Sequence, residues 1–104
     1  MRVRKYDDPE QAIHVAPDET FAIELKGNPT TGYTWQADID THYAELITQE
    51  YAPQQGPAGA IGAGGWEVFH FRAREAGETQ IVFLHRRPWG GATRDTKRFK
   101  LVID

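Results

Sequence analysis

The sequence contains neither cysteine nor serine. Without cysteine there is no disulfide framework and no thiol chemistry. Without either residue, the chain also lacks the usual thiol and hydroxyl nucleophiles of acyl-transfer enzymes. A threonine nucleophile usually relies on a free N-terminal amine or an adjacent base, whereas Thr30 and Thr31 are internal and have no His or Lys in their loop. The composition therefore favours a protein that is not an enzyme.

Long apolar runs and clustered metal ligands are missing as well. No stretch approaches the roughly 18 apolar residues of a membrane span. No secretory signal is visible in the chain as given, which fits a cytoplasmic protein or the mature form of a secreted or periplasmic one. The four histidines are scattered without metal-ligand spacing. His70 and His85 fall inside strand-like runs, so we expect them on a sheet surface, and we expect no metal or other cofactor.

A strong excess of charge of one sign is also absent. The chain has 12 Lys and Arg against 15 Asp and Glu, a formal net charge of −3, and its basic residues are spread along the sequence. This distribution argues against nucleic-acid binding. The 104 residues, 39% of them hydrophobic, suffice for one core and one domain. We therefore expect a single domain over residues 1–104, a monomer with no nucleic-acid or membrane partner.

What the sequence does contain is a series of short alternating segments. Phe21, Ile23 and Leu25 alternate with small or polar neighbours, as in a half-buried strand. Residues 43–51 fit a helical turn or a strand, and their β-branched and aromatic side chains favour the strand. The other strand-like segments are 2–6, 12–15, 20–26, 33–39, 66–74, 80–85 and 98–103.

About seven or eight short strands with regular turn signals predict an all-β fold, an immunoglobulin-like antiparallel β-sandwich. Trp35 fits the place where immunoglobulin-like domains bury a core tryptophan. Because no disulfide can lie beneath it, aromatic and aliphatic packing must hold the two sheets together. Fully burying one such side chain contributes roughly 1.5–3 kcal/mol.

The order of the strands makes the longest connections share one end. In an antiparallel sandwich, consecutive connections fall at opposite ends. If strand 20–26 runs upwards, the connections at 28–33, 52–65 and 86–97 all lie at the top, and the bottom connections are short and acidic. Long loops that share one end of a rigid scaffold are where sandwiches bind partners.

The first top loop is short and stiff. Pro29 fixes its own φ, and Gly32 can adopt a positive φ where the chain turns back. A simple hairpin needs only two residues, so this loop is either a plain corner between sheets or a segment that presents something. It reads Asn28-Pro29-Thr30-Thr31-Gly32-Tyr33.

The other two top loops carry a run of glycines and a tryptophan that follows Arg and Pro. The second ends in Gly62-Ala63-Gly64-Gly65, and the third opens with Arg87-Pro88-Trp89. Phosphate binding needs a helix after the glycines, whereas a strand pattern follows here. The run is therefore a flexible loop tip or backbone that approaches a partner closely. Trp and Arg are enriched at binding hot spots, but Trp89 could equally fold back as a lid on the core.

Together and in this order, the three stretches resemble the chagasin family, proteinaceous inhibitors of papain-like cysteine peptidases. Family members look like Asn-Pro-Thr-Thr-Gly-aromatic, Gly-x-Gly-Gly and Arg-Pro-Trp in successive loops. Two departures are Trp66, which is bulkier than expected after the glycines, and Tyr33, where Phe is common. The resemblance covers nearly the whole chain and extends to Glu67, Phe69, Asp95, Arg98 and Phe99.

The resemblance implies a function and a site. It implies a reversible, tight-binding inhibitor whose three loops form a wedge that occludes the cleft of a papain-like cysteine peptidase, with the Thr-Thr loop over the catalytic Cys and His. A competing hypothesis is an immunoglobulin-like adhesion or carbohydrate-binding module that uses Trp66 and Trp89 as stacking platforms. The peptidase-binding residues implied are Asn28, Pro29, Thr30, Thr31, Gly32, Tyr33, Gly62, Ala63, Gly64, Gly65, Arg87, Pro88 and Trp89.

Overall fold

The structure is a computed structural model that describes residues 3–27, 31–53 and 65–104. Within these ranges, the chain forms eight β-strands and contains no helix long and apolar enough to cross a membrane. The strands are β1 (Arg4–Tyr6), β2 (Ile13–Val15), β3 (Thr20–Gly27), β4 (Thr34–Asp38), β5 (Ala44–Pro53), β6 (Gly65–Ala73), β7 (Gly77–Arg86) and β8 (Asp95–Ile103).

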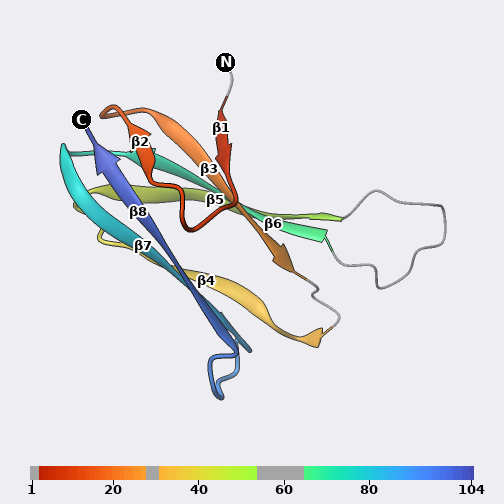
Figure 1. Ribbon diagram of the computed structural model, residues 1–104. Coiled ribbons are helices and arrows are strands. Elements are labelled where there is room, and N and C mark those ends of the chain that lie inside the picture. The colour runs from red at the N-terminus through yellow and green to blue at the C-terminus, as the bar shows by residue number, and fades with distance from the viewer. Residues whose placement is uncertain (1–2, 28–30, 54–64) are drawn as a thin grey trace.

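The strands form two sheets that pack face to face (Figure 1). One sheet has the order β1-β3-β6-β5 and the other β2-β8-β7-β4. The short strands β1 and β2 pair in parallel with β3 and β8, and all other pairs are antiparallel. The predicted all-β sandwich is therefore confirmed, with a short parallel strand added at one edge of each sheet.

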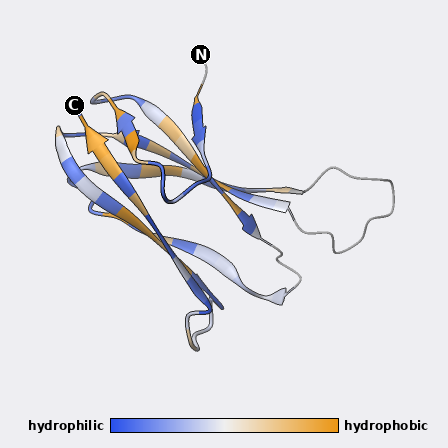
Figure 2. Ribbon diagram, viewed as in Figure 1, coloured by the Kyte–Doolittle hydropathy of each residue, from blue (hydrophilic) through white to orange (hydrophobic). Residues whose placement is uncertain are grey.

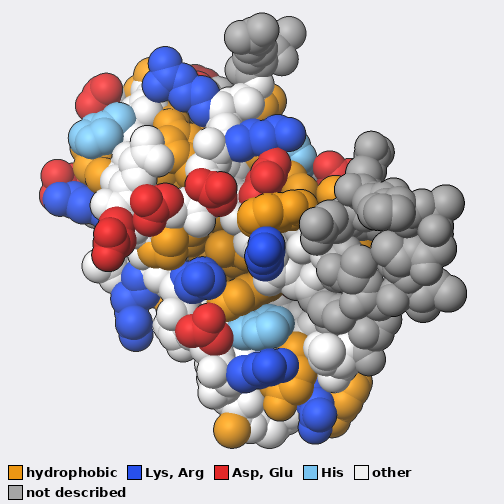
Figure 3. Space-filling view, turned by 45° about the vertical axis from the view of Figure 1, so that its right-hand side comes forward, with side chains coloured by type: hydrophobic (Ala, Val, Ile, Leu, Met, Phe, Trp, Pro, Cys, Tyr) orange, Lys and Arg blue, Asp and Glu red, His pale blue; other side chains and the backbone are white. Residues whose placement is uncertain are grey.

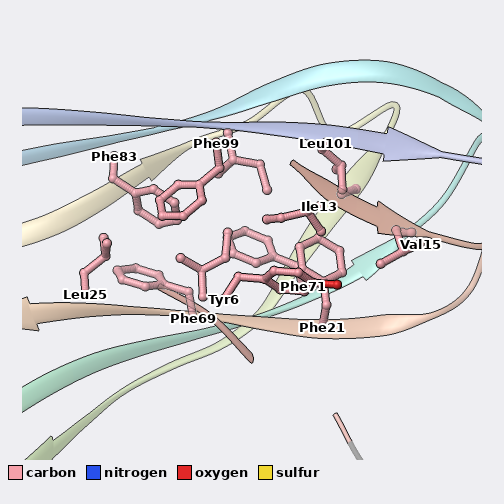
Figure 4. Packing of buried hydrophobic residues seen from close by; sticks show 14 of the residues in the cluster. Tyr6, Ile13, Val15, Phe21, Leu25, Phe69, Phe71, Phe83, Phe99 and Leu101 are labelled. Atoms are coloured by element: carbon pink, nitrogen blue, oxygen red, sulfur yellow. The ribbon is translucent and has the colours of Figure 1, made fainter. Parts of the chain in front are cut away.

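Aromatic packing joins the two sheets. Because side chains alternate across a strand, cross-strand partners share a face, and Phe21 opposite Phe71 and Ile23 opposite Phe69 both point inwards. The same alternation appears as bands of hydropathy along the ribbons in Figure 2. The ring of Phe69 on β6 lies 4.9 Å from that of Phe83 on β7, so it bridges the sheets (Figure 4). These contacts do the work that a disulfide does in many sandwiches of this shape.

The pairing directions place the three long connections at one end. β3 and β5 both run antiparallel to β6, and β4 and β8 both run antiparallel to β7. The strand ends that flank residues 28–33, 54–64 and 87–94 therefore lie together, towards the lower right of Figure 1. We call these the first, second and third loops and this end the loop end. The opposite end, with the short connections, is the turn end.

Two strands begin earlier than the alternating pattern suggested. β7 begins at Gly77 and β8 at Asp95, because the two strands pair along their whole length, from Gly77 opposite Ile103 to His85 opposite Asp95. The third loop is correspondingly shorter, residues 87–94. At strand ends both faces reach solvent, so polar residues occupy them and hide the period of two.

Of the ambiguous segment 43–51, all but Tyr43 lies within strand β5, which is the outer strand of its sheet. The register shifts between Leu46 and Thr48, leaving Ile47 as the extra residue of a bulge. Ile47 is 50% exposed. The choice of a strand over a helical turn is confirmed, and the bulge makes this edge less suited to pairing with another chain.

Candidate functional site

The first and third loops touch each other through Gly32 and Trp89. Gly32 has a φ of 81°, the turned-back conformation that a side chain would disfavour. A Cβ atom built on Gly32 would lie 3.0 Å from Cη2 of Trp89, so the indole ring lies directly against the glycine. Trp89 is 74% exposed. It is therefore not a lid on the core but an exposed ring seated on the first loop.

Arg87 joins Trp89 to the first loop. Its guanidinium lies 4.8 Å from the centroid of the Tyr33 ring and 5.9 Å from that of the Trp89 ring. Cation–π contacts at exposed sites contribute roughly 0.5–1 kcal/mol each. The N–H of Gly90 donates to the carbonyl of Arg87 at 3.1 Å, which closes the turn around Trp89. We call Gly32, Tyr33, Arg87 and Trp89 the loop cluster.

A stack of rings anchors the loop cluster on the sandwich. The Tyr33 and His85 ring centroids are 5.5 Å apart, and those of His85 and Trp35 are 4.4 Å apart with 18° between the planes. Trp35 is buried, and its indole N–H donates to the carbonyl of Lys26 at 2.9 Å. The rings thus continue from the exposed loops into the core.

His85 is the residue that sequence reasoning placed wrongly. It was expected on a sheet surface, but it lies opposite Trp35 in the ladder and on the inward face that Phe83 also occupies. The signal was present, since Phe83 sets the inward side of β7 and His85 follows two positions later. His70 does lie on the outer side of its sheet, where its ring contacts Glu50 at 3.3 Å.

The surroundings of His85 favour its neutral form. Its Nε2 atom is buried and has no hydrogen-bond partner among the described residues. Burial lowers the pKa of His85 below its ordinary value of 6.5, the positive charge of Arg94 lowers it further, and Asp95 opposes the shift. Because the folded state lowers this pKa, the contribution of His85 to stability is lost as the pH falls below 6.5 towards the lowered pKa.

Glu67 ties the two sheets together beneath the loops. It is only 7% exposed, and its carboxylate oxygens accept the N–H of Trp35 at 3.3 and 3.2 Å. The side chain of Gln49 donates to the carbonyl of Trp35 at 3.2 Å. Burial raises the pKa of Glu67, while the hydrogen bonds from Trp35 and Gln49 oppose the rise. The first strand after the first loop is thereby fixed to β5 and β6 of the other sheet.

The wild type should lose stability as the pH rises, because Glu67 becomes charged in a buried position, and we expect Glu67→Gln to remove this loss. Because folding raises the pKa of Glu67, its contribution is fully present below 4.5 and is lost as the pH rises through the raised pKa. The unfolding free energy of the variant, relative to the wild type, should therefore increase as the pH rises above 4.5. Denaturant unfolding at a series of pH values measures this difference, and a difference that stays constant with pH would contradict the expectation.

The beginning of β6 carries the last residue of the glycine run. Gly65 is buried and lies between Gly27 of β3 and Pro53 of β5. Trp66 follows it, opposite Lys26, whose Nζ lies 5.9 Å from the indole ring. The bulk of Trp66 is thus taken up beside β3 rather than in the loop cluster.

An open hollow of about 830 Å³ lies between the ends of β3 and β8 at the loop end. Its lining includes Trp35 and His85 and charged side chains of both signs, which are Lys26, Arg94, Lys97, Asp7, Glu24 and Asp95. Figure 3 shows apolar surface bordered by basic and acidic side chains on this face. A partner that reached the loop cluster would also meet this charged surface.

The structure describes only part of the site expected from the sequence. It brings together Gly32, Tyr33, Arg87 and Trp89, with Pro88 between the last two. Thr31 is exposed, and its Oγ1 accepts the N–H of Tyr33 at 3.3 Å. Gly65, at the start of β6, is not among these contacts but lines the same hollow as Thr31. The expected residues that lie outside the described ranges are Asn28, Pro29, Thr30, Gly62, Ala63 and Gly64.

The described part of the loop end exposes side chains of the kinds that are common at protein–protein contacts. Nowhere in the described ranges do His, Asp and Glu side chains gather in a group that could hold a metal ion. The loop end exposes an indole ring and guanidinium groups. Trp and Arg side chains are enriched at protein–protein hot spots. Arg94, which the sequence did not single out, adds a second guanidinium 5.2 Å from the Tyr33 ring.

Comparison with known proteins gives consistent matches over nearly the whole chain. The model of the Chagasin family of peptidase inhibitors matches residues 14–103. Amoebiasin-1 of Entamoeba histolytica is 36% identical over 98 residues, covering 94% of this chain and 93% of the relative. Chagasin of Trypanosoma cruzi is 32% identical over 96 residues, covering 88% and 86%. The crystal structure of a cysteine protease inhibitor from Entamoeba histolytica superposes with a TM-score of 0.83 at 23% identity, covering 98% and 96%.

Proposed function

Because this chain belongs to the Chagasin family of peptidase inhibitors, we propose that it inhibits papain-like cysteine peptidases by covering their active-site cleft with its three loops. The inhibition is tight, reversible and non-covalent. The observation that carries the proposal is the loop cluster, in which the first and third loops form one exposed surface with Trp89 seated on Gly32. Family membership also favours this function over the adhesion or carbohydrate-binding module that the sequence left open.

Each loop has its own role in the proposed complex. The first loop, with Asn28, Pro29, Thr30 and Thr31, lies over the catalytic Cys and His. The second and third loops grip the two walls of the cleft. The second does so through the backbone of its glycine run, residues 62–65, and the third through the flat face of the Trp89 ring.

The backbone conformation of the first loop explains how it can occupy the cleft without being cleaved. A substrate lies extended and presents its scissile carbonyl at about 3–3.5 Å from the nucleophile. Gly32, with a φ of 81°, turns the chain back immediately after Thr31. Because the loop is bent there, no carbonyl needs to align with the thiolate.

The contacts of Arg87 support tight binding. Its guanidinium lies 4.8 Å from the Tyr33 ring and 5.9 Å from the Trp89 ring, so both loops are already held together in the free protein. Immobilising a side chain on binding costs about 0.5–1.5 kcal/mol, and a preformed surface avoids part of that cost. A total contact area of about 1,600 Å² would be typical of such a complex.

An inhibition panel tests the proposal. The purified protein is titrated against papain and several cathepsins, with serine peptidases as controls. We expect stoichiometric loss of cysteine-peptidase activity that returns on dilution, and unchanged serine-peptidase activity. Absence of inhibition at micromolar concentration across the cysteine peptidases would refute the proposed function, and inhibition that does not reverse on dilution would refute its non-covalent form.

A further inference from the structure

Positive charge gathers at the loop end. The first and second loops contain no charged residue in the sequence. The carboxylates at the loop end are those of Asp95, the buried Glu67, and Asp7 and Glu24, which line the hollow there, and Glu24 is paired with Lys5. The loop end therefore carries an excess of positive charge, although the formal net charge of the chain is −3. Its basic side chains, in the third loop and in the strand residues that adjoin the loops, are Lys26, Arg86, Arg87, Arg94 and Lys97.

These cations lie against aromatic rings rather than against carboxylates. Arg87 and Arg94 lie 4.8 and 5.2 Å from the centroid of the Tyr33 ring, and Lys97 lies 5.9 Å from that of Trp35. None of these three cations forms an ion pair within the described ranges. An aromatic ring holds a cation in place without cancelling its charge. Asp7 and Asp95, which line the same hollow, offset the positive charge of the loop end only in part.

The turn end has the opposite sign. Arg72 there is paired with Asp18 at 3.2 Å. Figure 3 shows acidic side chains mainly over the upper and left parts of the molecule, with one lower down among basic side chains. The protein is thus electrically polarised along its strands, positive at the loops and negative at the turns. The acidic residues of the turn end include Asp18, Glu19, Asp40, Glu75, Glu78 and Asp104.

From this polarity, and resting on the proposed function, we propose that the protein is steered to papain-like peptidases whose active-site cleft has an acidic rim. An acidic rim attracts the loop end and repels the turn end, so the encounter is oriented as well as accelerated. Peptidases with a neutral or basic rim lack this attraction and are captured more slowly. The polarity therefore selects among papain-like enzymes that share the same catalytic centre.

Steering of this kind has a characteristic dependence on salt. Electrostatic attraction raises association rates by about 10- to 1,000-fold at low ionic strength. The screening length shrinks from about 30 Å at 0.01 M to about 8 Å at 0.15 M. We therefore expect the association rate constant with an acidic-rimmed peptidase to fall by about tenfold or more over this range, with little change in the dissociation rate constant.

Two charge reversals of equal size test the proposal. Lys26→Glu changes an exposed cation at the loop end, and Arg74→Glu changes an exposed cation at the turn end. Both variants have the same total charge, so only the position differs. Stopped-flow inhibition of papain, and of cathepsins chosen to have acidic or basic cleft rims, gives the association rate constants at low and at physiological ionic strength. Arg94→Glu serves as a second loop-end variant should Lys26→Glu fold poorly.

The outcomes separate this proposal from the proposed function. Lys26→Glu should slow association with the acidic-rimmed enzymes several-fold at low salt and flatten its salt dependence, whereas Arg74→Glu should not slow it. Association that is independent of salt, or slowed equally by both variants, overturns the steering while leaving the inhibitor function intact. Complete absence of inhibition by the wild type overturns the proposed function itself.

Discussion

Trp89→Ala is expected to raise the inhibition constant for a papain-like cysteine peptidase by about 30-fold or more. Loss of a hot-spot side chain costs about 2 kcal/mol or more, and each 1.4 kcal/mol corresponds to about tenfold in affinity. Trp89 meets the description of such a residue, since it is 74% exposed in the free protein and held over Gly32 at the centre of the loop cluster. On binding, it has most of its surface left to bury.

The stability of the Trp89→Ala variant should change little. An exposed ring contributes little to the core, so the melting temperature measured beside the inhibition constant should stay close to that of the wild type. Ile47→Ala is a matched control, because Ile47 is also a large exposed hydrophobic residue but lies on the β5 edge, away from the loop cluster. Inhibition by the control should be unchanged. An unaltered inhibition constant for Trp89→Ala would remove Trp89 from the site.

The fold was largely predictable because it depends on a local signal. Half-buried strands alternate inward and outward residues, and segments such as 20–26 show this without interruption. Consecutive connections in an antiparallel sandwich alternate between its two ends, and this alternation alone predicted that the three long loops share one end. The starts of β7 and β8 were missed because Gly77 and Asp95 lie where the alternation fades, and only their pairing reveals them.

The position of the site in the fold could be predicted from the sequence, but most of the contacts within the site could not. The alternation of the connections and the family resemblance predicted that the first and third loops lie together, and their contact through Gly32 and Trp89 agrees with that. Whether Trp89 faces solvent or the core depends on the twist of the sheets and on side-chain rotamers, and neither can be read from the spacing of residues in the sequence. The tie between Glu67 and the N–H of Trp35 crosses from one sheet to the other. Such a contact depends on how the two sheets stack, and it could not be predicted from the positions of Glu67 and Trp35 in the sequence.

The ring stack gives the loop end a rigid base. The neutral ring of His85 lies between Tyr33, at the edge of the loop cluster, and Trp35, in the core. Glu67 fixes the backbone of Trp35 from the opposite sheet. Through these contacts the core holds the loops, and a preformed binding surface loses less conformational entropy when it docks.

Gly32→Ala is expected to weaken inhibition by about tenfold or more without unfolding the protein. The φ of 81° is disfavoured for any residue with a Cβ, at a cost of about 1–2 kcal/mol. The added methyl would also lie 3.0 Å from Cη2 of Trp89, a tight contact that the ring must relieve by moving a few tenths of an ångström. Because Trp89 and the first loop both belong to the proposed contact surface, a displacement of either one reduces its fit to the cleft, and a preorganised site works only when its groups are held within about 0.5 Å.

Gly77→Ala separates this local effect from general destabilisation. Gly77 also has a positive φ, 147°, and a Cβ there would lie 2.7 Å from Cε1 of Tyr43, but it is at the turn end. Both variants therefore combine backbone strain with a close contact, and both should lower the unfolding free energy. Only Gly32→Ala should raise the inhibition constant once each protein is titrated for its folded fraction. Equal inhibition by the two variants would show that the contact between Gly32 and Trp89 belongs to the fold and not to the binding surface.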